Sequence, residues 1–308
     1  MNTKLIATLI FLTALSSYSQ TSQSAATANE NTSRAGLSDI LQNKKFQENE
    51  KITDAKLKAD GGSLSKYSLS ATLSYYGPTL GDFSAADQPN PDGNGGNYET
   101  ALGGSLGGRF RFDSRSSLTA GTGLKAIHPF HGLERFDVNN PYLSYNLSDR
   151  FGEVQIRNSA GVSVITVPSY TKVGETAGLN WDTSAVYNLG DTRFAVGLDT
   201  SVAYYFYYRG YEKTDIKTTT LYKVSAFPNI KYNFTDKFSV NTSVNFSAYN
   251  PRNRYNQSVL LNNSISERLG VGYAYTRDIY FAPYLNFYPS NLSDDGTTIN
   301  FSTVFSVL

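Results

Sequence analysis

Residues 238–250 of this 308-residue chain read Phe-Ser-Val-Asn-Thr-Ser-Val-Asn-Phe-Ser-Ala-Tyr-Asn. From Phe238 to Ala248 every second residue is apolar or a threonine, and the residues between them are serine or asparagine. Alternation with a period of two places the two sets on opposite faces of an extended chain. The stretch therefore predicts a β-strand with one apolar face and one small, polar face.

The same alternation continues through the chain from residue 65 onward, and it predicts an all-β, antiparallel fold of twelve strands. Most of the segments are about 10–17 residues long, which exceeds the usual strand length of about 5–6 and suffices for a tilted membrane crossing of about 9–11. The strands are expected at about 65–76, 99–113, 116–127, 140–149, 152–166, 177–189, 192–208, 218–234, 238–250, 257–276, 278–289 and 296–308.

The connections between these segments alternate strictly between long and short. The long ones are 77–98, 128–139, 167–176, 209–217, 251–256 and 290–295, and the short ones are 113–116, 148–152, 189–192, 235–237 and 276–278. A soluble sandwich has no reason to keep all its long loops at one end, whereas a transmembrane β-barrel has short periplasmic turns and longer external loops. If both ends of the barrel are periplasmic, the number of strands must be even.

Aromatic residues gather at the strand ends. The chain has 23 Tyr and 18 Phe but a single Trp. Membrane–water interfaces select such belts of aromatic rings, so two belts are expected. Beside the short turns lie Phe110, Phe112, Tyr145, Phe151, Tyr187, Phe194, Tyr232, Phe234, Phe238, Tyr273, Tyr275 and Phe281, and beside the long loops lie Tyr75, Tyr142, Tyr204, Phe206, Tyr208, Tyr222 and Tyr249.

With these features, residues 65–308 resemble the bacterial outer-membrane β-barrel proteins. The resemblance implies a Gram-negative cell outer membrane, contact with outer-membrane lipid and lipopolysaccharide, and help from the barrel-assembly machinery during insertion. Such proteins usually end on an aromatic residue with another aromatic or apolar residue two positions earlier. Phe305 and Val307 fit the alternation, but Leu308 departs from that ending.

The residues ahead of the barrel divide into two parts. Residues 1–19 predict a cleaved signal peptide, with Lys4, an apolar run of about eleven residues and small residues before Gln20; a spanning helix needs roughly 20. Residues 20–64 are expected to be flexible and weakly helical, with Ser38 as a candidate N-cap for residues 36–60. This segment is interpreted as a periplasmic tether, an interaction helix or a plug in the lumen, with a solvated, loosely ordered tail as the simplest expectation.

Composition excludes several classes of function. The formal net charge of +1 gives no electrostatic basis for binding nucleic acid. The absence of cysteine excludes disulfide scaffolds, cysteine-ligated zinc, thiol catalysis and a lipoprotein anchor. No cofactor or metal is expected.

The inward-facing residues predict the chemistry of the lumen. By the alternation these positions carry the basic residues Lys66, Arg109, Arg111, Lys125, Arg157, Lys223, Lys231 and Arg268, and the acidic residues Asp113, Asp182 and Asp199. Arginine and lysine in a pore favour anions, so the excess predicts a channel for small hydrophilic solutes with a preference for anions. Lumen charges in small barrels also pair into networks that fill the interior. The alternative is a non-conducting structural or surface-interaction barrel that acts through its extracellular loops.

A third hypothesis is an outer-membrane hydrolase. It depends on His128 and His131, which begin a long loop that also carries Glu134, Arg135 and Asp137. No third zinc ligand is obvious, and no His-x-Ser motif is visible. A role in packing the loop is the simpler interpretation of both histidines.

Three residues break the strand pattern. Glu267 falls on the lipid face in the middle of the expected strand 257–276, and Pro228 and Pro283 interrupt strands of a sheet that has no edge. We expect β-bulges at all three places, with the one near Glu267 at Ser266–Leu269.

Overall fold

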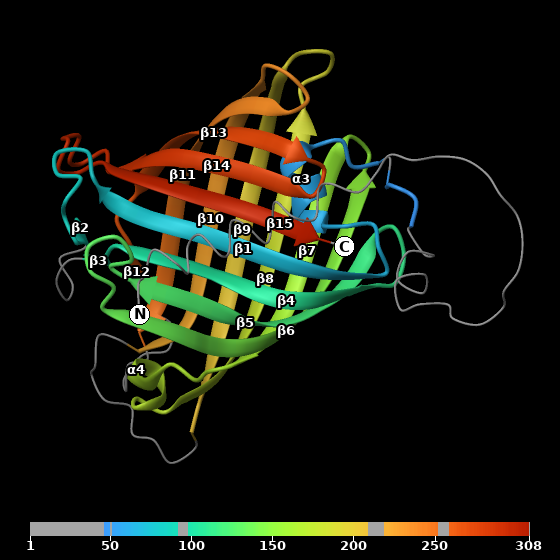
Figure 1. Ribbon diagram of the computed structural model, residues 1–308. Coiled ribbons are helices and arrows are strands. Elements are labelled where there is room, and N and C mark those ends of the chain that lie inside the picture. Colours follow the sequence, from blue (N-terminus) through green and yellow to red (C-terminus); the bar gives the residue numbers. More distant parts are fainter. Residues whose placement is uncertain (1–45, 50, 92–97, 209–218, 252–258, 308) are drawn as a thin grey trace, which may run out of the picture. The chain divides into compact units, whose positions relative to one another are not determined.

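The computed structural model describes residues 46–49, 51–91, 98–208, 219–251 and 259–307. Twelve long antiparallel strands form a closed barrel (Figure 1), because each strand pairs with its neighbours in the chain, β1 pairs with β15 and β10 pairs with β11. The twelve strands are β1 Tyr67–Thr79, β4 Ala101–Arg111, β5 Ser116–Ile127, β6 Arg135–Phe151, β7 Val154–Val164, β8 Glu175–Asn188, β9 Phe194–Tyr207, β10 Thr220–Asn233, β11 Phe238–Pro251, β13 Ser266–Thr276, β14 Ile279–Phe287 and β15 Thr298–Val307.

Short elements complete the described chain. Strands β2 (Asp87–Gln88) and β3 (Tyr98–Glu99) pair with each other, and β12 (Leu261–Asn262) pairs with β11. The helices are α3 (Ala55–Gly61) and α4 (Pro168–Thr171). Among the described residues no helix has the length and apolar character that a membrane crossing requires.

The twelve-strand prediction is confirmed, and the differences lie at the strand ends. Strand β6 begins at Arg135, five residues earlier than expected, and β13 begins only at Ser266. Glu267 is therefore the second residue of β13 rather than a mid-strand residue, and the register through Ser266–Leu269 is continuous, so the bulge expected there is absent. Because the strand starts so late, Glu267 lies near the loop end of the barrel.

The bulges expected at the two prolines are also absent. Pro228 and Pro283 keep continuous register with β9 and β15 respectively. Between β10 and β11 the pairing skips Phe227 and Pro228 and then resumes in the same register. Between β14 and β13 it skips Ala282 and Pro283 and also resumes in the same register. Each proline has no N–H to donate to one of its two neighbouring strands. A few ladder pairings to that strand are therefore missing, and no extra residue is inserted.

The barrel is apolar outside and polar inside. Alternate residues such as Leu69, Leu106 and Leu198 are 44–48% exposed on the outer face, while Ser70, Thr119 and Asn146 are buried on the inner face. A water-soluble protein buries the opposite set of residues. The outer face therefore suits hydrocarbon, which tolerates strands only in a closed ring.

Aromatic rings form a girdle beside the short turns. Tyr67 packs against Phe110, and Phe110 against Phe112, at centroid distances of 5.3 and 5.0 Å. A second run, Phe194–Tyr232–Phe234–Phe238, has centroid distances of 4.8, 4.8 and 5.6 Å. The girdle confirms the expected sorting of aromatic residues toward the short-turn end, which is the periplasmic end in this architecture.

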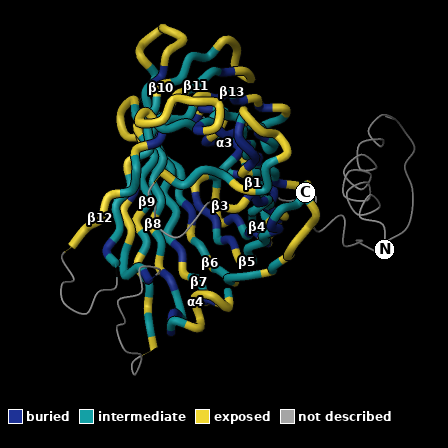
Figure 2. Tube along the Cα trace, turned by 90° about the vertical axis from the view of Figure 1, so that its left-hand side faces the viewer, coloured by how far each residue is buried: buried dark blue, intermediate teal, exposed yellow. Residues whose placement is uncertain are grey.

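The described residues ahead of β1, with the helix α3, lie in the lumen of the barrel (Figure 2). We call residues 46–49 and 51–64 the plug; its helix α3 contacts β13, β14 and β15 and also β6. Asp54 caps the helix by accepting from the Leu57 N–H at 3.0 Å, and Gly62 ends it with a φ of 72°. Ala59 is fully buried against Ala274 and Tyr280 of the wall.

Residues 46–49 and 51–64 are packed inside the barrel, which agrees with the plug interpretation for this part of the segment. Within these residues the helix covers Ala55–Gly61. The expected signal peptide, the candidate cap Ser38 and the terminal Leu308 lie outside the described residues.

Candidate functional site: the lumen and its plug

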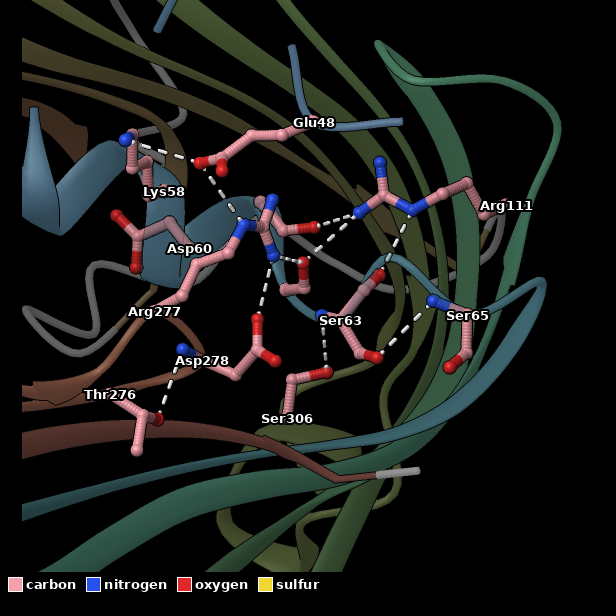
Figure 3. A network of polar contacts seen from close by, with 12 residues as sticks. Glu48, Lys58, Asp60, Ser63, Ser65, Arg111, Thr276, Arg277, Asp278 and Ser306 are labelled. Carbon is pink, nitrogen blue, oxygen red and sulfur yellow. Dashed lines mark hydrogen bonds and ion pairs between the residues drawn. The ribbon is translucent and has the colours of Figure 1, made fainter. Parts of the chain in front are cut away.

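Arginines of the wall bind the backbone of the plug. From β4, Arg109 donates to the Gly61 carbonyl oxygen at 2.8 Å, and Arg111 donates to the carbonyl oxygens of Gly61 at 2.6 Å and Ser63 at 3.0 Å. Arg277, in the turn between β13 and β14, reaches the Gly62 carbonyl oxygen at 2.7 Å; Figure 3 shows it approaching from a different side than Arg111. The last carbonyls of a helix lack intrahelical donors, so these guanidinium groups satisfy acceptors that burial would otherwise leave unpaired.

One ion pair and two hydrogen bonds fix the start of the plug helix. Lys231 of β10 binds the Asp54 carboxylate, and their side chains are only 12% and 3% exposed. Gln155 of β7 is fully buried, and its Oε1 accepts from the N–H groups of Thr53 at 2.7 Å and Asp54 at 2.9 Å. Because a buried charge that loses its partner is costly, these contacts hold the plug firmly in one position.

Further ion pairs are partly exposed to water. Lys56 Nζ lies 3.2 Å from Asp199 Oδ2, and Lys58 Nζ lies 3.1 Å from Glu48 Oε1. Lys51 Nζ lies 3.4 Å from Asp149 Oδ1. Such exposed pairs contribute roughly 0–1 kcal/mol each, so they add less than the pair at Lys231.

A narrow gap remains between the plug and the wall formed by β4, β5, β6 and β7. Its volume is about 20 Å³, which holds about one water molecule. Five basic side chains and one carboxylate line it: Lys58, Arg111, Arg115, Arg157, Arg277 and Glu48. Lys58 and Arg277 pair with Glu48, and Arg115 pairs with Asp149. The positive charge of the gap therefore comes mainly from Arg111 and Arg157.

A larger cavity of about 400 Å³ lies on the other side of α3. Its walls come from β8, β9, β10, β11, β13, β14 and β15. Its ionisable lining residues are Asp54, Lys56, Asp60, Asp182, Asp199, Lys231, Arg268, Tyr280 and Tyr284. Unlike the gap, this cavity carries charges of both signs.

The alternation placed nine of the ten expected pore-lining residues on the inner face. Arg109 and Arg111 hold the plug, Arg157 lines the gap, and Asp182, Asp199, Lys231 and Arg268 line the cavity. Lys125 pairs with Glu99 at 3.5 Å, and Lys223 lies opposite Ala203 and Tyr249, on the lumenal face of β10.

Two expected inward residues lie elsewhere. Lys66 precedes β1, and its Nζ lies 5.8 and 5.3 Å from the ring centroids of Tyr67 and Phe110, so it joins the outer girdle. Asp113 lies in the turn after β4, where it accepts from the N–H groups of Arg115 and Ser116 at 2.7 and 2.8 Å. Both residues flank a strand, where the strict alternation of faces no longer applies.

The two histidines join loops at the opposite end. His128, at a φ of 50°, places Nδ1 3.0 Å from Glu134 Oε2 and Nε2 3.6 Å from Asp87 Oδ1. His131 Nε2 lies 3.2 Å from the Phe83 carbonyl oxygen. Across the described ranges there is no group of three or more side chains fit to hold a metal ion. The contacts fit loop packing, as expected from the simpler interpretation.

A closed antiparallel barrel with an apolar outer band, an aromatic girdle and a charged lumen is the architecture of the bacterial outer-membrane β-barrel proteins, and this chain has that fold. No family model and no curated protein matches it in sequence.

Among solved structures, it is similar to the NanC porin, with 8% identity over 78% of this chain and 99% of that one and a TM-score of 0.42. An outer-membrane channel from Pseudomonas putida F1 shares 11% identity over 80% and 98% of the two chains, with a TM-score of 0.46. OprD from Pseudomonas aeruginosa shares 13% over 69% and 60%, with a TM-score of 0.35. These are likenesses of fold alone.

Proposed function

We propose that the protein is an outer-membrane channel for small hydrophilic solutes and that it prefers anions. The observation that carries the proposal is the gap beside the plug, where five cationic side chains and one carboxylate surround a water-sized space. A narrow passage lined by one sign of charge lowers the barrier for ions of the opposite sign. Because the space holds about one water molecule, larger solutes pass only when the plug side chains move.

The test is the reversal potential of the purified protein in a planar bilayer under a salt gradient, with Arg157→Glu as the variant. Arg157 lines the gap but donates to Asn146 at 2.8 Å instead of to the plug, so its charge can be reversed while the plug stays anchored. Arg109 and Arg111 are less suitable because they hold the plug backbone. We expect anion preference in the parent and a shift toward cations in Arg157→Glu.

Lys223→Glu is the matched control, since Lys223 faces the lumen but lines neither the gap nor the cavity. It is expected to shift the reversal potential less than Arg157→Glu does. Equal shifts, or none, would contradict selection at the gap. A bilayer that shows no conductance after confirmed insertion would favour the non-conducting barrel, whose loops are then the functional surface. The many contacts between the plug and the wall are the observation in favour of that second candidate.

A further inference from the structure

The 400 Å³ cavity contains charges that the protein itself leaves uncompensated. Two ion pairs form among its lining residues, Lys231 with Asp54 and Lys56 with Asp199. Arg268, Asp60 and Asp182 also line the cavity. None of the three forms an ion pair within the described chain, although Asp60 lies close enough to Lys56 and Arg109 to interact with their charges. Arg268 and Asp182 are therefore the uncompensated groups. A lumen that only needed filling would have paired these charges, because an unpaired charge in a confined space is unfavourable.

The guanidinium group of Arg268 is positioned to bind an anionic group. It projects from β13, and its Cζ lies 5.5 Å from the ring centroid of Phe227 and 5.1 Å from that of Tyr284. Its Nε is shielded from solvent and has no hydrogen-bond partner among the described residues. Rings on the guanidinium reduce its freedom, and the planar donor fork matches a carboxylate in a bidentate arrangement.

Asp182 and Asp60 supply the opposite charge on other walls. Asp182 projects from β8, which is separated from β13 by β9, β10 and β11 in the ring, and one of its oxygens accepts from Asn180 Nδ2 at 2.8 Å. Asp60 comes from the plug helix. A solute that satisfies Arg268 and these two carboxylates together needs a negative group at one end and a positive group at the other.

The surface between the charges is suited to amide groups. Six short polar side chains line it: Ser184, Ser201, Asn229, Asn241, Ser243 and Ser302. They offer both donors and acceptors, as a peptide bond requires. The volume falls in the range of about 300–1,000 Å³ found for small-molecule sites.

We propose that this cavity binds a short zwitterionic peptide, with its carboxylate on Arg268 and its ammonium group at Asp182 and Asp60. The inference rests on the proposed channel in one respect: the cavity is then a stopping point for a solute on its way past the plug. A carboxylated sugar would satisfy Arg268 but leave Asp182 uncompensated, so it is the competing class.

The experiment is equilibrium binding of trialanine to the purified full chain in detergent, by isothermal titration calorimetry. N-acetyl-trialanine removes the positive end, and trialanine amide removes the negative end. We expect trialanine to bind and each capped peptide to bind at least about tenfold more weakly, since each loses a charge-assisted contact. These ligand variants test the charges without any change to the protein.

Protein variants test the residues themselves. Arg268→Gln and Asp182→Asn are each expected to weaken trialanine binding about tenfold or more, whereas Lys223→Gln, outside the cavity, leaves it unchanged. Absence of trialanine binding, equal binding of the capped peptides, or glucuronate binding as tightly as trialanine would overturn the proposal. Because binding is measured without a membrane, its failure is distinguishable from a failure of anion-selective conduction.

Discussion

Replacing Lys231 with methionine is expected to release the plug from the lumen. The variant keeps a side chain of similar length on β10 but leaves the Asp54 carboxylate, 3% exposed, without its partner. Breaking a buried ion pair on one side costs roughly 3–5 kcal/mol. That cost corresponds to roughly a 10²- to 10⁴-fold change in the equilibrium between the docked and the released plug.

Thiol labelling measures this equilibrium directly, because the chain contains no cysteine. Ser63→Cys places a single, nearly isosteric thiol at a plug residue that is 5% exposed. Labelling by a maleimide should be slow in the parent and at least about a hundredfold faster in the Lys231→Met background.

Two further variants serve as controls for the effect of Lys231→Met on the labelling rate. Lys58→Met removes an exposed ion pair with Glu48, worth about 0–1 kcal/mol, so labelling should rise less than about fivefold. Adding Asp54→Asn to Lys231→Met removes the buried charge while keeping a capping oxygen, so most of the increase should disappear. Unchanged labelling in a folded Lys231→Met barrel would refute the reasoning that this pair anchors the plug.

Two other changes can be followed by the same labelling rate. Gly62→Ala should raise the labelling rate at least about tenfold, because a φ of 72° costs an L-residue roughly 1–2 kcal/mol and the added Cβ would also collide with the Arg109 guanidinium group that holds the plug. Gly61→Ala is the control, since a Cβ there meets no atom within 4 Å, and equal rates would contradict the role of Gly62. Acidification should also raise the labelling rate relative to that of a free cysteine at the same pH, a comparison that cancels the fall in thiolate fraction. Burial raises the pKa of the Glu48 carboxyl, but Lys58 and Arg277 lower it by more, so its pKa lies below the ordinary 4.5. A group with a lowered pKa stabilises the docked state above its ordinary pKa, and that contribution is lost as the pH falls through the lowered value; Glu48→Gln should remove this part of the pH dependence.

The barrel was predictable because every strand meets lipid along one whole face and the lumen along the other. The Phe238–Ala248 stretch meets lipid on one face and the lumen on the other, so residue type alone reports the side. The same rule fails where a strand ends, which is why the alternation wrongly predicts Lys66 and Asp113 to face the lumen. The bulges predicted at Pro228 and Pro283 are absent for another reason: the pattern does not show that a strand can lose hydrogen bonds to one neighbour and keep its register with the other.

The sequence allowed a plug in the lumen as one of three interpretations but could not single it out, although part of the helix was predictable. Asp54 as a cap and Gly61-Gly62 as a stop are recognisable signals for a short helix. Its place in the lumen depends on Arg109, Arg111 and Gln155, which bind backbone groups. Backbone carbonyl and N–H groups are the same whatever the residue type, so the sequence of residues 46–64 does not indicate which side chains of the barrel bind them.

The distance in sequence between the plug and its partners has a consequence for biogenesis. Asp54 binds a lysine 177 residues later, and Glu48 contacts Arg277, 229 residues later. Although the plug is made before every strand, its binding surface exists only after β10, β13 and β14 have joined the ring. Seating of the plug therefore comes late in assembly, and a barrel that stalls with strands missing would leave it undocked, exposed to the proteases that remove unfinished proteins.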